Sequence, residues 1–171
     1  MILSIAILTL VTAQRLGELV VARRNTRRLL AQGGVERGAQ HYPLMVALHA
    51  AWLGGLWLLA WNRPANLWWL MGYILLEALR VWVLMSIGRR WTTRIIVVPG
   101  ESLVRRGPYR LIPHPNYAVV VGEIAVLPLA FGLVGFAVVF SLLNAAMLWL
   151  RIRTENHALA GAATGAAAPQ T

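Results

Sequence analysis

The sequence predicts an all-α integral membrane protein with about five transmembrane helices, the last two forming a hairpin. Three observations support this fold class. The chain is 58% apolar and 13% charged, with a mean hydropathy of +0.63, which is too hydrophobic for an ordinary soluble domain. Five apolar runs approach the ~20 residues that cross a bilayer. The arginines gather at the ends of these runs, so topology explains the net charge of +10 better than nucleic-acid binding does.

The expected spans, in chain order, occupy residues 2–22, 44–61, 67–87, 117–131 and 133–150. The first run lacks the basic n-region and the small-residue cleavage site of a signal peptide, so it is interpreted as a helix of the mature protein. Four tryptophans flank the short loop between the second and third spans, as in an outer aromatic belt: Trp57, Trp61, Trp68 and Trp69.

The last two spans are expected to fold back on each other. As one helix, residues 117–150 would be ~51 Å long, far more than the hydrocarbon core. Pro128, Gly132 and Gly135 offer a place to turn, and Asn116 is a candidate N-cap for the first arm. The Ala/Gly-rich residues 158–171 are expected to form a flexible tail.

The arginine distribution predicts the orientation. Counted from the N-terminus, the connections outside the spans carry zero, five, one, six, zero and two arginines. By the positive-inside rule, the N-terminus lies outside and the C-terminus is cytoplasmic. An alanine-rich chain with arginine but no lysine is interpreted as bacterial, so we expect the inner membrane, with the functional site facing the cytoplasm.

Five charged residues lie inside the expected spans, where unpaired charge is costly. Arg15 with Glu18, and Glu77 with Arg80, are each three residues apart and are expected to form structural pairs. Glu123 stands alone and could either pair with one of these arginines or meet the head of a substrate.

A second polar group inside the spans is His49, which is expected to hydrogen-bond to a neighbouring helix. The adjacent Gly54 and Gly55 are expected to allow close helix packing.

The longest connection, residues 88–116, contains the main chemical candidates. Pro113 and Pro115 flank His114, remove backbone donors and favour an extended, stiff segment that presents His114 at a fixed angle. The alternative is a rigid loop on the headgroups, with arginines contacting lipid phosphates: Arg105, Arg106 and Arg110.

Arg151 and Glu155 follow the last span and are four residues apart, so they share a helix face. In isolation such a pair is usually a surface ion pair of little energetic value. Below a membrane pocket, however, the arginine could bind an acidic oxygen through its planar fork, and the glutamate could accept hydrogen bonds from ribose hydroxyls or an ammonium group.

Taken together, the ordered motifs resemble the isoprenylcysteine carboxyl methyltransferase family. The resemblance covers about residues 89–159 and consists of Gly107-Pro-Tyr-Arg, His114-Pro-Asn-Tyr, the apolar hairpin and Arg151-x-x-x-Glu155. An earlier stretch is similar to short bacterial members, through Arg15-Leu-Gly-Glu18, Arg24-Asn25, His41-Tyr-Pro and His49.

The resemblance implies a single membrane methyltransferase domain over residues 1–157, with the cofactor-binding part at about 89–157. It implies transfer of a methyl group from S-adenosylmethionine to the carboxyl or acidic hydroxyl head of a lipophilic molecule, with membrane lipid as the other partner. Arg151 would face the acidic group of the substrate, with Glu123 as a further substrate contact. The cofactor would be held by Leu103, Val104, Tyr109, His114, Pro115, Asn116, Tyr117 and Glu155.

Two positions depart from the usual family pattern. Pro113 stands where the family often has arginine, and Asn156 follows Glu155 where the family often has a second glutamate. The first departure concerns how the loop is anchored, and the second whether one acid suffices for the cofactor.

The residue chemistry is compatible with methyl transfer, which requires an aligned oxygen nucleophile and the exclusion of water. The chain has no cysteine, no zinc-spaced histidines and no G-x-G-x-x-G fingerprint, so neither a metal nor nucleic acid is an expected partner. A carboxylate acceptor needs no general base, whereas a hydroxyl acceptor must arrive ionised or lose its proton to a residue such as His114.

Two functions of other classes stay open at this point. The chain could be an NADPH-dependent membrane reductase of the sterol-reductase type, or a non-enzymatic membrane scaffold. Binding of S-adenosylhomocysteine rather than NADPH separates the first from a methyltransferase, and free replacement of Tyr109, His114 and Glu155 would indicate the second.

Overall fold

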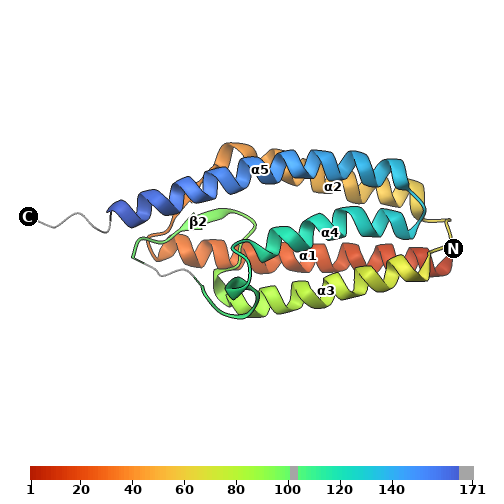
Figure 1. Cartoon of the computed structure of the whole chain (residues 1–171), viewed down its shortest axis with the longest axis horizontal. Helices are drawn as coiled ribbons and strands as arrows, with labels where there is room; N and C mark the ends of the chain where they lie inside the picture. Colours follow the sequence, from red (N-terminus) through yellow and green to blue (C-terminus); the bar gives the residue numbers. More distant parts are fainter. Residues whose placement is uncertain (101–103, 166–171) are drawn as a thin grey trace, which may run out of the picture.

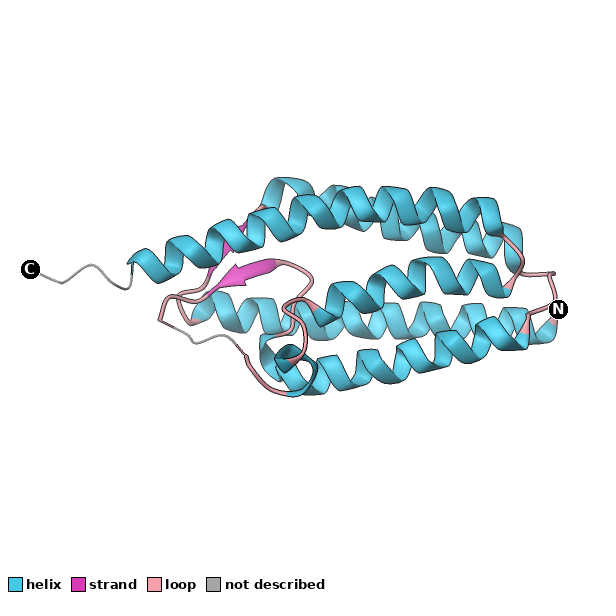
Figure 2. Cartoon of the chain, in the orientation of Figure 1, coloured by secondary structure: helices cyan, strands magenta, loops and turns pink. Residues whose placement is uncertain are grey.

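The computed structural model of the chain describes residues 1–100 and 104–165, which form a helical bundle with a small two-stranded sheet at one end (Figure 1, Figure 2). The helices are α1 (Ile2–Ala31), α2 (Tyr42–Ala60), α3 (Leu67–Ile87), α4 (Pro115–Ala130) and α5 (Val134–Gly165). Strands β1 (Val35–Arg37) and β2 (Ile95–Val97) pair antiparallel, with Glu36 opposite Ile96.

The bundle has the composition of an integral membrane protein. Four stretches are long and apolar enough to cross a membrane: Ile2–Ala31, Ala39–Ala60, Leu67–Arg90 and Val134–Ala158. The fifth expected span, α4, has 16 residues and is only ~24 Å long, shorter than the hydrocarbon core. Large apolar side chains face outward on several helices, as expected for a surface in contact with lipid: Leu10, Leu58, Trp68, Leu75 and Leu142.

The chain reverses between α4 and α5, at the place predicted from Pro128 and Gly132. Gly132 has a φ of 69°, a left-handed conformation that glycine adopts without strain. The amides of Phe131 and Leu133 each donate to the Pro128 carbonyl at 3.0 Å, which closes the turn. As a result α4 and α5 run antiparallel, and α5 returns to the end at which α4 began (Figure 1).

Several helix limits differ from the sequence prediction. α1 continues through the first arginine cluster to Ala31, because arginine is a good helix former once the chain leaves the apolar region. α4 begins at Pro115, so His114 rather than Asn116 occupies the N-cap position, and proline suits the first helical position because it needs no amide partner. α5 continues to Gly165, beyond residue 158, where the tail was predicted to begin.

The two ends of the bundle differ in character. The N-terminus, the α2–α3 loop and the α4–α5 turn lie together at one end, where the Asn66 amide donates to the Ala130 carbonyl at 2.7 Å. The β-strands, the connection that follows α3 and the C-terminal part of α5 lie at the opposite end (Figure 1). The arginine-rich connections therefore share one end, which we call the basic end.

The half of the bundle away from the basic end is tightly packed. Its core consists of Leu8, Val11, Trp52, Leu56, Ala60, Tyr73, Ile124, Leu127, Phe131 and Leu133. Gly55 allows α2 to approach α5, since a Cβ there would lie 2.6 Å from the Phe136 ring; this confirms close packing at one of the two predicted glycines. No atom lies within 4 Å of the corresponding position at Gly54.

A cluster of five charged side chains joins α1, α3 and α4 at mid-bundle. Glu123, 2% exposed, receives Arg80 Nε at 2.6 Å and Arg15 Nη2 at 3.0 Å. Glu18 receives Arg15 Nη1 at 2.9 Å and Arg80 Nη1 at 3.2 Å, and Arg15 also lies 3.5 Å from Glu77. Every member thus has an opposite charge as a neighbour, which offsets part of the cost of burying charge.

This arrangement corrects two expectations. Arg15 and Glu18 do pair, but Arg80 pairs with Glu18 and Glu123 instead of Glu77, because α1 and α4 bring their carboxylates to it. Glu123, predicted as a possible substrate contact, has both carboxylate oxygens bound by arginines. The pairing alternative for Glu123 is the one the structure contains.

We expect Glu123→Leu to destabilise the bundle, because it leaves Arg80 and Arg15 buried with one carboxylate fewer. Removing one partner of a buried ion pair typically costs about 3–5 kcal/mol. Thermal unfolding in detergent should therefore show a lower midpoint, part of which the double variant Glu123→Leu/Arg80→Met should recover. Arg63→Gln, at an exposed position, is the control, and a Glu123→Leu midpoint equal to that of the control would contradict the assignment.

Candidate active site

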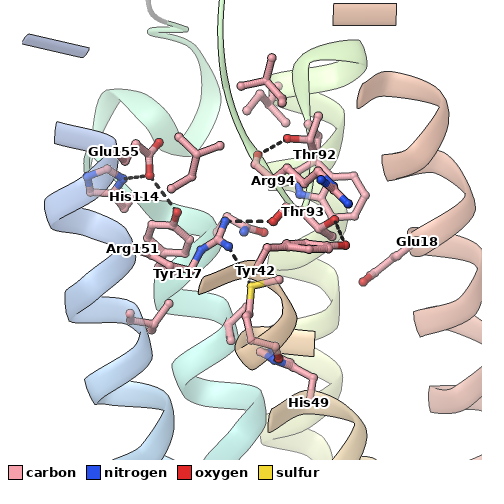
Figure 3. A pocket seen from close by; sticks show the side chains of 18 of the residues that line it. Glu18, Tyr42, His49, Thr92, Thr93, Arg94, His114, Tyr117, Arg151 and Glu155 are labelled. Carbon is pink, nitrogen blue, oxygen red and sulfur yellow. Dashed lines mark hydrogen bonds and ion pairs between the residues drawn. The ribbon is translucent and has the colours of Figure 1, made fainter. Parts of the chain in front are cut away.

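A cavity of about 820 Å³ occupies the half of the bundle nearest the basic end (Figure 3). Its walls come from all five helices and from the connection that contains β2. The helices are packed together beyond it, so the cavity ends near the charge cluster, where Arg15, Glu18 and Arg80 line it. One enclosed space therefore joins the loop region of the basic end to polar groups deep in the bundle.

Three side chains meet at the mouth of the cavity between α4 and α5. The Tyr117 hydroxyl donates to Glu155 Oε2 at 2.8 Å, and His114 Nδ1 lies 3.6 Å from the same oxygen. The His114 and Tyr117 rings stack with centroids 5.4 Å apart. Pro113 and Pro115 set this geometry, because they hold His114 just before the first turn of α4 while Tyr117 lies within it.

Tyr109 adds a hydroxyl group beside this cluster. It lies in a short 3-10 helix, Gly107–Arg110, that begins at Gly107 with a φ of 57°. Burial, and then the nearby Glu155 carboxylate, raise the pKa of the Tyr109 hydroxyl to about 12. Tyr109 therefore stays protonated at neutral pH and can act as a hydrogen-bond donor.

Arg151 lies deeper in the cavity and is 4% exposed. Its Nη2 donates to the Thr93 carbonyl at 3.0 Å, its Nη1 lies 3.0 Å from Met45 Sδ, and its buried Nε has no partner within the described residues. A sulfur atom is a weak acceptor, so the guanidinium group is poorly satisfied, and no carboxylate in the described part of the chain forms an ion pair with it. Such a buried cation favours an anionic ligand.

Arg151 and Glu155 do not form the ion pair that their spacing suggests. Glu155 contacts Tyr117 and His114 on α4 and the loop before it, whereas Arg151 points toward α2 and Thr93 (Figure 3). The Arg151 guanidinium lies 5.9 Å from the centre of the Tyr117 ring, which separates the two groups. They occupy two distinct positions in the same cavity.

The connection after α3 is held over the cavity by two contacts. The buried Asn25 side chain donates to the Trp91 carbonyl at 2.8 Å, and Arg94 Nη1 contacts both Glu36 oxygens at 2.7 and 2.9 Å. These contacts join the connection to α1 and β1. They fix the Thr93 carbonyl that receives Arg151.

An apolar slot leads from the cavity toward the outside of the bundle between α1 and α2. Its walls are Leu16, Leu19, Val46, Ala50 and Leu53. Leu16 and Val46 are also exposed at the bundle surface, by 59% and 40%.

Most of the site residues predicted from the sequence line this one cavity: Val104, Tyr109, His114, Asn116, Tyr117, Arg151 and Glu155. Pro115 is buried behind them at the start of α4. Leu103 lies outside the described residues. Glu123 belongs to the charge cluster below and is absent from the described cavity lining.

Sequence reasoning did not assign Tyr42, Met45 and His49 to the site. They are spaced by three and four residues, so they share the face of α2 that lines the cavity. This periodicity of polar or polarisable residues was a readable signal. Thr93 gave no such signal, because it reaches Arg151 only through the pairing of β1 with β2.

The chain is similar to a known protein family and to a bacterial protein. The model of the isoprenylcysteine carboxyl methyltransferase (ICMT) family matches residues 68–161, which include the whole Tyr109–Glu155 region. A Bacillus subtilis protein named uncharacterized protein YpbQ is 39% identical over 158 residues, covering 90% of this chain and 94% of the relative. No solved structure matches the chain.

Proposed function

This chain belongs to the isoprenylcysteine carboxyl methyltransferase family, and we propose that it is an S-adenosylmethionine-dependent O-methyltransferase acting on the carboxyl or acidic hydroxyl head of a lipophilic molecule. Membership of the family implies a methyltransferase, and the long apolar helices indicate an integral membrane protein. The observation that supports the finer proposal is the buried Arg151, which has no carboxylate partner among the described residues and lies further inside the cavity than the Tyr117–Glu155–His114 cluster.

The residues at the cavity mouth fit S-adenosylmethionine, which supplies an electrophilic methyl group on a positively charged sulfur. One Glu155 oxygen is bound by Tyr117 and His114, which leaves the other to accept from ribose hydroxyls or an ammonium group. The buried Asn116 Oδ1 has no partner within the described residues and lines the same space, so it offers a further acceptor. The Tyr109 and Tyr117 rings attract positive charge.

Arg151 would bind and orient the acidic oxygen of the acceptor. A guanidinium group presents two parallel N–H donors that match a carboxylate or enolate, and the low dielectric of a closed cavity strengthens the contact. Its present contact with Met45 sulfur is weak and easily replaced. The apolar slot between α1 and α2 would admit the acceptor's tail from lipid, while the polar donor enters at the basic end.

A reductase is the competing enzyme class, since Arg90, Arg94 and Arg105 line the cavity mouth and could meet nucleotide phosphates. Arg94 is already bound to Glu36 and stacks on the Tyr42 ring. Calorimetry on purified protein with S-adenosylhomocysteine and with NADPH separates the two classes. Binding of NADPH alone would overturn the methyltransferase proposal, and binding of neither, with no methyl transfer to any acceptor, would favour a scaffold.

We expect Glu155→Gln and Arg151→Lys to separate cofactor binding from acceptor binding. Glu155→Gln removes a charge-assisted hydrogen bond and should weaken S-adenosylhomocysteine binding by about 10- to 150-fold, equivalent to roughly 1.5–3 kcal/mol. Arg151→Lys should leave that affinity within about threefold but slow methyl transfer by about tenfold or more, since lysine lacks the planar fork. Calorimetry and transfer of a radiolabelled methyl group measure the two effects.

Arg153→Lys is the matched control, because Arg153 is exposed two residues further along α5 and stacks on Trp149. It should change neither quantity. Equal, small effects of Glu155→Gln and Arg151→Lys would contradict the assignment and indicate that neither residue binds a ligand.

We propose that the protein lies in a bacterial inner membrane with five spans, an N-terminus outside and the basic end on the cytoplasmic side; the arginine distribution supports this orientation. The chain contains no cysteine, so single substitutions report the topology directly. A membrane-impermeant maleimide added to spheroplasts should label Asn62→Cys at the opposite end and spare Gln32→Cys at the basic end. Inverted vesicles should give the reverse, and labelling of Gln32→Cys from outside would contradict this orientation.

A further inference from the structure

His49 is the one titratable residue of α2 that faces the deeper part of the cavity within the described chain (Figure 3). Its Nδ1 lies 2.9 Å from the carbonyl of Met45, one turn earlier in the same helix. A carbonyl oxygen only accepts, so Nδ1 carries the proton and the neutral ring has its lone pair on Nε2. No described residue bonds to Nε2, and the predicted bond from His49 to another helix is not formed.

His49 lies between two sets of charged groups. On one side, Arg151 Nη1 contacts the side chain of Met45, the residue whose backbone carbonyl lies one helical turn before His49. On the other side lies the charge cluster, of which Arg15, Glu18 and Arg80 line the same cavity. The part of the cluster that lines the cavity contains two guanidinium groups and one carboxylate, so the groups nearest the cavity carry a net positive charge.

This order of charges polarises an O–H group placed between Arg151 and His49. The positive Arg151 stabilises negative charge on the oxygen, while Arg15, Arg80 and Arg151 favour the neutral imidazole ring, whose Nε2 lone pair can accept a proton. Nε2 of His49 is the acceptor available for the proton. The apolar slot begins beside His49, at Val46, Ala50 and Leu53, so the head of a lipophilic molecule with its tail in the slot would lie against this ring.

We propose that His49 is the general base of the reaction and takes the proton of a hydroxyl acceptor held by Arg151. This inference rests on the proposed function and deepens it, because a base is needed for an enol or phenol and not for a carboxylate. The acceptor oxygen forms its bond to the methyl carbon as the carbon–sulfur bond breaks and the electron pair stays on sulfur. The proton remains on Nε2 and then leaves through the cavity mouth.

His114 is less suited to this role. Its Nδ1 faces the Glu155 carboxylate and its ring stacks on Tyr117, on the side of the cavity assigned to the methyl donor. His49 lies on the side of the slot, where the acceptor enters. One histidine would thus lie beside each of the two proposed ligands.

Titration of His49 would also reflect the other charged and titratable groups around it. These come from α1, α3, α4 and α5 and from its own helix: Arg15, Glu18, Arg80, Tyr117, Arg151 and Tyr42. Single substitutions at His49 leave all of these groups in place. A difference between wild type and a His49 variant therefore reports on the imidazole itself.

The first test needs no turnover. A nitrophenol with a long alkyl chain absorbs visible light only when ionised, so its absorbance reports its proton. With S-adenosylhomocysteine present, the phenol bound to the wild type should ionise at a pH at least about one unit lower than when bound to His49→Gln. His49→Asn should behave like His49→Gln. His157→Gln, at an exposed position on α5, is the matched control and should behave like the wild type.

The second test compares two acceptors with the same tail, an alkylphenol and a fatty acid. His49→Gln should slow methyl transfer to the phenol by about 100-fold at neutral pH, within the usual range for loss of a general base, and the loss should shrink as the pH approaches the pKa of the phenol. Transfer to the carboxylate, which is already ionised, should fall by less than about threefold. Unchanged S-adenosylhomocysteine affinity shows that the variant is folded.

The outcomes distinguish this inference from the proposed function. A wild type that binds S-adenosylhomocysteine and methylates only carboxylates overturns the role of His49 and leaves the methyltransferase intact. Equal losses of methyl transfer to both acceptors in His49→Gln also overturn the role of His49. So does nitrophenol that ionises at the same pH when bound to wild type and to His49→Gln, whether or not methyl transfer is seen. A wild type that transfers no methyl group to any acceptor and binds no S-adenosylhomocysteine overturns the proposed function.

Discussion

The charge cluster at mid-bundle is the interaction on which the rest of the structure depends. Arg15, Arg80 and Glu123 come from three helices, and each would be costly in hydrocarbon without the others. Their pairing fixes α1, α3 and α4 at one depth, above which apolar side chains pack closely. α2 contributes no charge to the cluster, so α1 and α2 are free to diverge below it and leave the cavity between them.

The basic end completes the cavity with stiff, anchored chain instead of another helix layer. Pro113 replaces the arginine frequent in the family, and the loop gains its anchor elsewhere, because Arg106 Nε donates to the Ser86 carbonyl at the end of α3 at 2.6 Å. On the other side of the cavity, the pairing of β1 with β2 holds the Thr93 carbonyl against Arg151. Backbone restriction therefore positions polar side chains that no regular helix would bring together.

Much of the fold and part of the site could be predicted from the sequence. The predictable features depend on local properties of the chain, and the others depend on which distant segments come together. Apolar run length, arginine distribution and the Pro/Gly turn specify the helices and the hairpin, because each is a local property. The order of the His114 and Glu155 motifs identified the mouth of the cavity. The partners of Glu123 and the place of His49 depend on which helix faces become neighbours, and a single sequence with short-range periodicity does not specify that. The β1–β2 pairing joins segments about 60 residues apart, so it left no local signal.

The charges that line the cavity suit the proposed reaction at two of its depths. Glu155 is negative at the mouth, and Arg151 is positive in the middle. The proposed ligands carry the opposite charges there: a positive sulfonium donor beside Glu155 and a developing oxyanion beside Arg151. Charge development during the transfer would therefore meet a compensating group at both positions without reorganisation of water. Deeper in the bundle, Arg15 and Arg80 line the cavity and favour the neutral form of His49. The fold that keeps five charged residues stable inside the bundle would, in this account, also keep the Nε2 lone pair available for the acceptor proton.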